Sequence, residues 1–184
     1  YKLLQANRSY RFLRQGQIVV DLGAAPGGWL QVVRQVVGES GFVLGVDKQE
    51  IRPLSHRNVV TMVGDIEDSS LPDQIGQKMS GPVDVVLSDA SPDLTGNWEL
   101  DQARQVYLAD RSLEIAERLL RRGGSFFVKA FHGADLPDFR SRLLECFRTV
   151  RIVKPPASRS DSSEIYFLGL TYTGGRHLSG ASDA

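Results

Sequence analysis

The stretch VVDLGAAPGGW, residues Val19 to Trp29, decides how the rest of the chain is interpreted. It begins as a continuous apolar run that closes on Asp21, which is typical of a strand buried on both faces of a sheet. The loop that follows contains Gly23, Gly27 and Gly28, and glycines permit tight turns and the close approach of a ligand to the backbone. The loop matches neither G-x-G-x-x-G, typical of dinucleotide sites, nor the phosphate loop G-x-x-x-x-G-K-S/T. The sequence therefore predicts a ligand loop that holds something other than a pyrophosphate.

Strand-like and helical segments alternate along the chain. Apolar runs rich in valine and isoleucine predict strands at residues 17–23, 41–47, 58–64, 83–89, 124–131, 149–155 and 163–172. Apolar residues at helical spacing predict helices at residues 27–37, 71–79, 98–124 and 136–147. The longest helix is expected to close on a basic last turn and a glycine stop at residues 121–124. This alternation predicts a doubly wound α/β sheet with right-handed crossovers and helices on both faces.

Composition sets the class of protein. A length of 184 residues, with 41% apolar and 24% charged residues, is ordinary for one soluble globular domain. Basic and acidic residues number 22 each, so the whole-chain charge gives no reason to expect an anionic partner, although a local basic patch is compatible with it. The lone Cys146 excludes an internal disulfide and a multi-cysteine zinc site, and we expect it to be a buried small hydrophobe. No membrane span or signal peptide is visible, which favours a cytoplasmic protein. We expect a single domain over residues 1–172 and a disordered polar tail at residues 173–184.

Four successive predicted strands end in acidic residues, namely Asp21, Asp47, Asp65 and Asp89. In an open α/β sheet the ligand lies outside the carboxyl ends of the strands, where an acid after the second strand can hydrogen-bond a ribose. Asp65 stands where an acid can meet an adenine amino group. Several carboxylates disfavour a pyrophosphate, but they suit S-adenosylmethionine, a nucleoside that carries an ammonium and a sulfonium. Helix caps and turns explain any one of these acids, and a dinucleotide enzyme or a non-catalytic α/β domain stays open at this point.

Four charged residues are candidates for the chemistry. Lys129, at the end of the apolar run GSFFVKAF, is costly to bury unless it is paired or serves a purpose. Asp89 ends the preceding strand, Glu164 begins the last predicted strand, and Lys2 opens the chain. If these side chains meet above the sheet, two ammoniums and two carboxylates share one site, which can produce a lysine that accepts a proton. A structural network of salt bridges explains the same residues equally well.

The motifs VVDLGAAPGGW, GVD, GD, SDASPDLTGN, GGSFFVKAF and KPPASRSDSSEIYFLG, in this order, closely resemble the FtsJ (RrmJ-like) family of RNA ribose 2′-O-methyltransferases. The resemblance runs from Tyr1 to about Tyr172, and the start YKLLQ looks like the (A/F)KL helix of that family. It implies a Rossmann-like, S-adenosylmethionine-dependent methyltransferase fold. The sheet of such a fold has seven mostly parallel strands, with the last strand antiparallel to the rest.

The resemblance also implies roles for particular residues. A K-D-K-E catalytic tetrad maps onto Lys2, Asp89, Lys129 and Glu164, and S-adenosylmethionine contacts map onto Gly27, Gly28, Trp29, Asp47, Asp65 and Asp89. Lys129 would accept the proton of a ribose hydroxyl, Lys2 would steady the nucleophilic oxygen, and the two acids would orient the lysines. No metal is expected, because the sulfonium already carries a good leaving group. The histidines, His56, His132 and His177, show no ligand spacing.

An RNA substrate requires a basic surface beside the site. Candidates on both sides of it are Arg8, Arg11 and Arg14, close to Lys2, and Arg151, Lys154 and Arg159, ahead of Glu164. Each arginine taken singly is more typical of a solvated helix face. Tyr1 and Tyr10 are candidates for stacking on bases, although Tyr10 fits the core equally well.

The leading hypothesis is a monomeric enzyme that methylates a uridine of large-subunit (23S-type) ribosomal RNA. The anticodon loop of a tRNA and the cap of an mRNA are alternatives within the same chemistry. Two further hypotheses belong to other classes. The sequence GAAPGG argues against a dinucleotide-dependent oxidoreductase, and the intact tetrad argues against a catalytically inactive RNA-binding domain.

Overall fold

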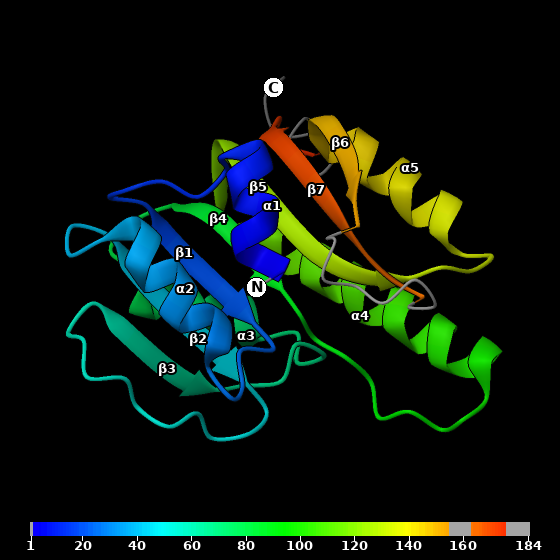
Figure 1. Ribbon diagram of the computed structural model, residues 1–184, viewed down its shortest axis with the longest axis horizontal. Helices are drawn as coiled ribbons and strands as arrows, with labels where there is room; N and C mark the ends of the chain where they lie inside the picture. The colour runs from blue at the N-terminus through cyan, green and yellow to red at the C-terminus, as the bar shows by residue number, and fades with distance from the viewer. Residues whose placement is uncertain (1, 155–162, 176–184) are drawn as a thin grey trace, which may run out of the picture.

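The computed structural model describes residues 2–154 and 163–175, in which helices and strands alternate along the chain (Figure 1). The helices are α1 (Lys2–Tyr10), α2 (Gly28–Val37), α3 (Leu71–Lys78), α4 (Trp98–Leu119) and α5 (Leu136–Cys146). The strands are β1 (Ile18–Leu22), β2 (Phe42–Asp47), β3 (Val59–Val63), β4 (Val83–Ser88), β5 (Leu120–Phe131), β6 (Phe147–Val153) and β7 (Glu164–Tyr172). Over the described residues, no helix has the length and apolar character needed to cross a membrane.

All seven strands belong to one sheet, in the order β3-β2-β1-β4-β5-β7-β6. The pairings from β3 through β5 are parallel, whereas β7 is antiparallel to both of its neighbours, β5 and β6. The predicted sheet, mostly parallel with an antiparallel last strand, is thus confirmed. The strand order changes direction between β1 and β4, and a switch point of this kind is where open α/β sheets bind their ligands.

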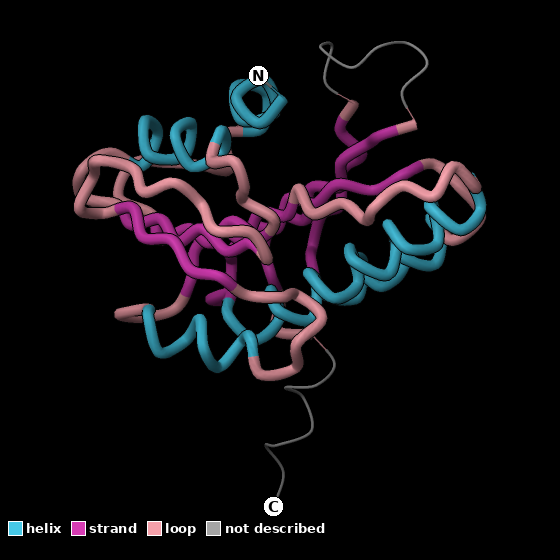
Figure 2. Tube along the Cα trace, turned by 90° about the horizontal axis from the view of Figure 1, so that it is seen from below, coloured by secondary structure: helices cyan, strands magenta, loops and turns pink. Residues whose placement is uncertain are grey.

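Helices cover both faces of the sheet, as the alternating sequence predicts. Figure 2 shows α1 and α2 on one side of the strands and α3, α4 and α5 on the other. Successive residues of a strand point to opposite faces, so Val19 joins the core beneath α1 and α2, and Val20 joins the core beneath the other three helices. Strands covered in this way need apolar residues on both faces, which explains the continuous apolar runs.

The end of α4 differs from the sequence prediction. The helix ends at Leu119, and residues 121–124 belong to β5 instead of forming a basic last turn and a glycine stop. The guanidinium of Arg121 binds the carboxylate of Asp84, and Nη1 of Arg122 donates to the carbonyl oxygen of Thr173 at 2.9 Å. Neighbouring strand ends therefore hold both arginines in extended backbone, and this tertiary contact outweighs the local helix-stop signal.

Cys146 is buried at the end of α5, as expected for a small hydrophobe. Its Sγ donates to Oε1 of Glu117 at 3.3 Å. Burial, reinforced by Glu117, raises the pKa of the thiol to about 12. The thiol therefore stays protonated at neutral pH and has little nucleophilic character.

Candidate active site

The loops after β1 and β4 meet at the carboxyl edge of the sheet. Gly23, directly after β1, has a φ of +71°, and a Cβ atom there would lie 2.7 Å from main-chain atoms of Ala90. The amides of Gly23 and Ala24 also donate to the carbonyl of Val46 on β2, at 2.8 and 3.0 Å. Only glycine combines this backbone conformation with so close an approach. Gly23 thus draws the ends of β1, β2 and β4 around one point.

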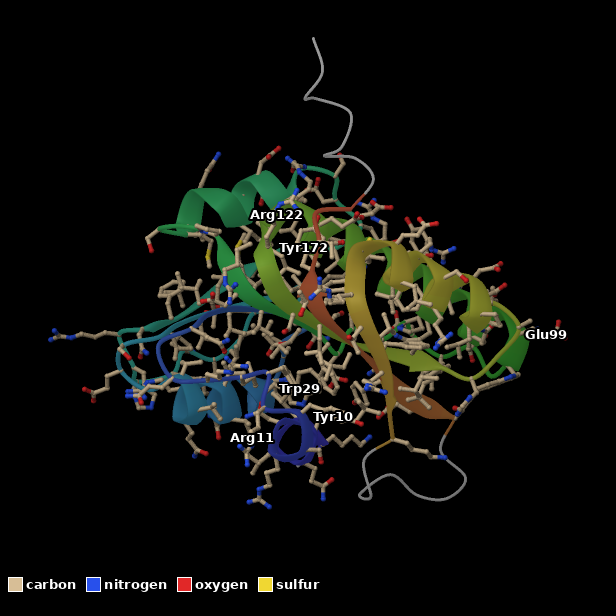
Figure 3. The ribbon with its side chains drawn as sticks, turned by 90° about the horizontal axis from the view of Figure 1, so that it is seen from above. Tyr10, Arg11, Trp29, Glu99, Arg122 and Tyr172 are labelled. Carbon is tan, nitrogen blue, oxygen red and sulfur yellow. The ribbon has the colours of Figure 1, made fainter. Side chains whose placement is uncertain are left out.

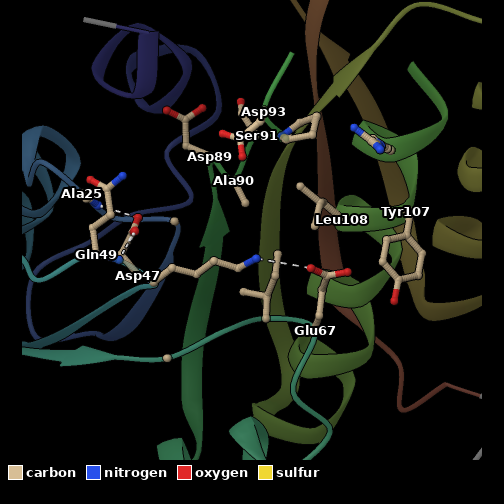
Figure 4. A pocket seen from close by; sticks show the side chains of 16 residues that line it. Ala25, Asp47, Gln49, Glu67, Asp89, Ala90, Ser91, Asp93, Tyr107 and Leu108 are labelled. Atoms are coloured by element: carbon tan, nitrogen blue, oxygen red, sulfur yellow. Dashed lines mark hydrogen bonds and ion pairs between the residues drawn. The ribbon is translucent and has the colours of Figure 1, made fainter. Parts of the chain in front are cut away.

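A cavity of about 550 Å³ opens at that point (Figure 4). Four carboxylates line it, those of Asp47, Glu67, Asp89 and Asp93, against two cations, Lys48 and Arg104. Figure 4 shows Asp47 on one side of the cavity and Tyr107, from α4, on the opposite side. The volume lies within the range of small-ligand sites, and the excess of carboxylates over cations favours a ligand that carries positive charge.

Asp47 and Asp65 each organise the turn that follows their strand. The carboxylate of Asp47 accepts from the amide of Gln49 at 2.9 Å and from the amide of Ala25, in the glycine loop, at 3.0 Å. Asp65 accepts from the amide of Glu67 at 2.9 Å. The simpler explanation of these strand-end acids, as turn residues, therefore applies to both. For Asp47 it does not exclude a ligand role, because each carboxylate oxygen keeps a second lone pair.

The residues predicted to contact the cofactor divide into two groups. Asp47 and Asp89 line the cavity, whereas Gly27, Gly28, Trp29 and Asp65 lie outside its lining. The glycines and Trp29 lie at the start of α2, and the Trp29 ring packs on the rings of Phe127 and Tyr166, with centroids 5.8 and 5.9 Å away. Oδ2 of Asp65 pairs with Nζ of Lys48, a cavity residue, at 3.2 Å. Cofactor contacts at these four residues stay predictions.

The charge of Asp21, on the central strand β1, influences which ligand the cavity fits. It lies opposite Gly45 and Leu87, two residues before Asp47 and Asp89 on the neighbouring strands. The side chain is fully buried, and neither carboxylate oxygen has a hydrogen-bond partner in the described part of the chain. Burial, with Asp89 and Asp47 adding to it, raises the pKa of Asp21 well above its usual value. Asp21 lies outside the cavity lining, so a cationic ligand in the cavity would act on it through space, by favouring its ionised form. The site therefore fits S-adenosylmethionine better than a nucleoside diphosphate.

The four residues of the predicted tetrad lie together where α1 meets β4, β5 and β7. Nζ of Lys2 forms an ion pair with Glu164. Nζ of Lys129 donates to the main-chain carbonyl of Asp89 at 3.0 Å and lies 3.4 Å from its carboxylate Oδ1. Only 7% of Lys129 is exposed. The structure thus brings together two ion pairs, which is the arrangement that the sequence hypothesis requires, while the catalytic roles stay predictions.

Tyr166 links the two ion pairs, and the sequence reasoning missed it. Its hydroxyl lies 3.0 Å from Oδ1 of Asp89 and 3.1 Å from Oε1 of Glu164. It stands directly opposite Lys129 in the β5–β7 ladder, and its ring stacks on Phe127 with centroids 4.8 Å apart. Residues two apart on a strand share a face. The spacing between Glu164 and Tyr166 is therefore a signal that could have found this residue.

Gln105 of α4 is a second residue that the sequence reasoning missed. Its buried side chain donates from Nε2 to the carbonyl of Ala90 at 2.9 Å and to the carbonyl of Lys129 at 3.3 Å. Ala90 directly follows Asp89, so one amide group ties together the two strands that carry the Lys129–Asp89 pair. No local motif marks Gln105, because its partners lie 15 and 24 residues away in the chain.

Burial and neighbouring charges set the protonation of the cluster. Burial raises the pKa of Asp89; Lys129 and the Tyr166 hydroxyl oppose this, and Glu164 adds to it, with the net shift upward. Burial and the two carboxylates raise the pKa of Tyr166 far above its usual value. The phenol therefore stays protonated at neutral pH, and its single O–H donates to the carboxylate of either Asp89 or Glu164.

The basic residues predicted to meet RNA lie on the outside of α1 and β6. Arg8 lies in the last turn of α1, Arg11 and Arg14 follow that helix, and all three are exposed. Arg151 and Lys154 are exposed on and just after β6. Tyr1 and Arg159 lie outside the described residues.

The described histidines show no grouping with other ligand side chains. Within residues 2–154 and 163–175, no three histidine, cysteine or acidic side chains are arranged to hold a metal ion. His177 and the rest of the predicted tail beyond Gly175 lie outside the described residues.

Comparison with known proteins identifies the family to which the chain belongs. The family model of FtsJ-like methyltransferases matches residues 1–172. The chain is 48% identical to the ribosomal RNA large subunit methyltransferase E of Methanothrix thermoacetophila, and 41% identical to the protein of the same name from Methanocaldococcus jannaschii. These alignments cover 92% and 95% of this chain, but 65% and 72% of the relatives, so the chain spans about two thirds of their length.

Solved structures show the same fold. A ribosomal RNA methyltransferase from Plasmodium falciparum superposes with a TM-score of 0.84 at 26% identity, over 96% of this chain and 97% of that one. Aeropyrum pernix fibrillarin, crystallised with bound S-adenosylmethionine, superposes with a TM-score of 0.60 at 16% identity. That alignment covers 86% of this chain and 68% of fibrillarin, and at this identity the likeness concerns the fold alone.

Proposed function

Because the chain belongs to the FtsJ-like methyltransferase family, we propose that it transfers a methyl group to the 2′-hydroxyl of a ribose in RNA. Its cofactor is S-adenosylmethionine. The observation that carries the proposal is the buried pairing of Lys129 with Asp89 beside a second pair, Lys2 with Glu164, at the edge of a carboxylate-lined cavity. Charged pairs that are buried beside a ligand cavity are more typical of a functional site than of a purely structural salt bridge.

The cluster can activate a ribose hydroxyl with its own side chains. When bound, S-adenosylmethionine supplies an electrophilic methyl group. Lys129 accepts the hydroxyl proton: a neutral amine keeps two N–H groups, enough to maintain the bond to the Asp89 carbonyl, while its lone pair faces the hydroxyl. Lys2, held by Glu164, places a positive charge where negative charge develops on the attacking oxygen. Asp89 and Tyr166 fix the direction of the Lys129 amine.

The substrate that we propose is a uridine of large-subunit ribosomal RNA. The names of the two relatives support large-subunit ribosomal RNA over the tRNA anticodon loop and the mRNA cap. A monomeric protein acting in the cytoplasm is part of the same proposal.

Methylation of separated RNA classes tests the function. The protein is incubated with S-adenosylmethionine labelled in its methyl group and, in parallel, with ribosomal RNA, large subunits, tRNA and capped mRNA. We expect label in ribosomal RNA or in large subunits, recovered after nuclease digestion as a nucleoside methylated on the 2′-oxygen. Label on a base, or label confined to tRNA or capped mRNA, would contradict the proposed reaction or the proposed substrate, respectively.

A further inference from the structure

A second hollow of about 480 Å³ lies between α1 and the end of β6. Its α1 wall carries Gln5, Arg8 and Tyr10, and its β6 wall carries Ile152 and Lys154. We propose that this groove, called here the α1–β6 groove, binds the nucleotide next to the methylated ribose in a single-stranded segment of RNA. The inference rests on the proposed function, and it specifies the path of the RNA strand on the surface of the protein.

Charge separates the groove from the cofactor cavity. Arg8 and Lys154 are exposed cations on opposite walls, and none of the eight described residues that line the groove is acidic. The cofactor cavity carries four carboxylates and only two cations, Lys48 and Arg104. A phosphate backbone is therefore attracted to the α1–β6 groove and repelled from the cofactor cavity. Only the target ribose, which bears no charge of its own, needs to approach the tetrad.

The groove also offers contacts that a nucleobase can use. Tyr10 is 37% exposed at the end of α1, where Figure 3 shows it beside Arg11. An exposed aromatic ring of this kind is a stacking surface for any base. Oε1 of Gln5 is buried and has no hydrogen-bond partner in the described part of the chain. Because Gln5 lines the groove, a turn of this side chain toward the groove would let Oε1 accept from a base amino group or a ribose hydroxyl.

The groove leads directly to the tetrad. On α1, Lys2, Gln5 and Ser9 follow one another at helical spacing along one side of the helix, so the groove wall and the tetrad lysine share that side. Lys2 and Tyr10 are about 12 Å apart along the helix axis, at 1.5 Å per residue. On the other wall, Val153 at the end of β6 pairs with Tyr166 in the β6–β7 ladder. A strand lying in the groove therefore passes from Tyr10 to the reacting centre.

Binding of a fluorescein-labelled, uridine-rich single-stranded RNA oligonucleotide tests the groove, measured by fluorescence anisotropy over a range of salt concentrations. Tyr10→Ala is expected to weaken binding about ten-fold, the loss of one base stack, and Tyr10→Phe to retain it. Reversing two charges, Arg8→Glu with Lys154→Glu, is expected to flatten the slope of log K against log salt by about 1.4. The control is Arg57→Glu, an exposed arginine between β2 and β3, which should bind like the wild type.

Two further measurements separate this proposal from the proposed function. S-adenosylmethionine affinity, measured by calorimetry, should be the same in every groove variant, which also shows that the variants fold. Groove variants that bind the oligonucleotide with wild-type affinity and salt slope would overturn the groove assignment, even if the wild type methylates RNA. Methylation of intact subunits that is lost without any change in oligonucleotide binding would also overturn it, and would assign the groove to a ribosomal protein. A wild type that methylates no RNA, yet binds the oligonucleotide through Tyr10, would overturn the proposed function and support the groove.

Discussion

Lys129 contacts Asp89 at two points, through its main-chain carbonyl at 3.0 Å and its carboxylate at 3.4 Å. The carbonyl contact needs only one N–H group, so it holds the nitrogen in place whether or not the amine is charged. The same geometry therefore serves either a general base or a fixed positive charge.

Replacing Lys129 by arginine separates these two roles. A guanidinium keeps its positive charge but cannot lose a proton in a protein. If Lys129 is the base, Lys129→Arg should be as inactive as Lys129→Ala, with S-adenosylmethionine affinity nearly unchanged in calorimetry. Substantial turnover by the arginine variant across the pH range would show that the proton leaves by another route.

Tyr166→Phe should lower kcat roughly ten-fold and leave binding of S-adenosylmethionine and RNA unchanged, because the ring still packs on Phe127. The missing hydroxyl leaves Asp89 and Glu164 without the donor that lies between them. The matched control is Tyr172→Phe, on the same strand, whose hydroxyl donates to the Glu117 carbonyl away from the site. Equal effects of the two substitutions on kcat would reduce Tyr166 to a packing residue.

Gln105→Leu should lower kcat while the KM for RNA stays put, because the separation of the strands that carry Asp89 and Lys129 is no longer fixed. We expect a loss of about ten-fold and a cost of about 1 kcal/mol in stability. Gln102→Leu is the control: Gln102 is also buried on α4, and its Nε2 has no hydrogen-bond partner among the described residues. Steady-state kinetics in which both variants behave alike would argue against a positioning role.

Asp47→Ala should weaken S-adenosylmethionine binding by at least about 1 kcal/mol, the scale of a hydrogen bond to a charged group. Asp47 lines the cavity and also holds the glycine loop through the amide of Ala25, so both contributions act in the same direction. Glu50→Ala removes the same charge from an exposed neighbour outside the cavity lining and should have no effect. Calorimetry that gives the wild-type affinity for Asp47→Ala would remove this residue from the site.

Asp21→Asn should stabilise the cofactor-free protein at neutral pH. Burial raises the pKa of Asp21 in the folded state, whereas in the unfolded chain its pKa is about 3.9. The folded state then holds the proton more tightly, so the wild type loses stability as the pH rises from the unfolded-state pKa through the folded-state pKa. Asparagine has no such proton, and its advantage in Tm should grow over that range, by about 2–4 °C per kcal/mol.

Thermal melts from about pH 4 to pH 8 measure this advantage. An advantage that does not change with pH would mean that folding leaves the pKa of Asp21 at its unfolded-state value. Saturating S-adenosylmethionine should reduce the advantage at neutral pH, because a cationic ligand compensates the carboxylate of the wild type.

Periodicity was enough to predict the sheet and its helices, because strands covered on both faces need continuous apolar runs and covering helices need one apolar side. It failed at Arg121 and Arg122, where contacts with Asp84 and Thr173, distant in the chain, hold extended backbone. The sequence next to a residue does not show which distant residues will contact it in the fold.

The candidate site divides in the same way. The family resemblance placed Lys2, Asp89, Lys129 and Glu164 in one cluster, and the structure brings them together. Tyr166 and Gln105 were missed because their importance arises from what they touch. The phenol matters only because two acids from different strands converge on it, and the amide only because two strand ends lie within its reach.

The antiparallel direction of β7 has a consequence for when the active site forms during folding. A strand that runs against its neighbours presents its first residue, Glu164, at the edge where β4 and β5 end, so the ion pair with Lys2 joins residues 162 positions apart. Contacts of such long sequence separation close late in folding. A nascent chain that has emerged only as far as β6 holds α1 and the cofactor loops, but it lacks Glu164 and Tyr166. The protein would thus become able to transfer a methyl group in a single step, when β7 inserts between β5 and β6.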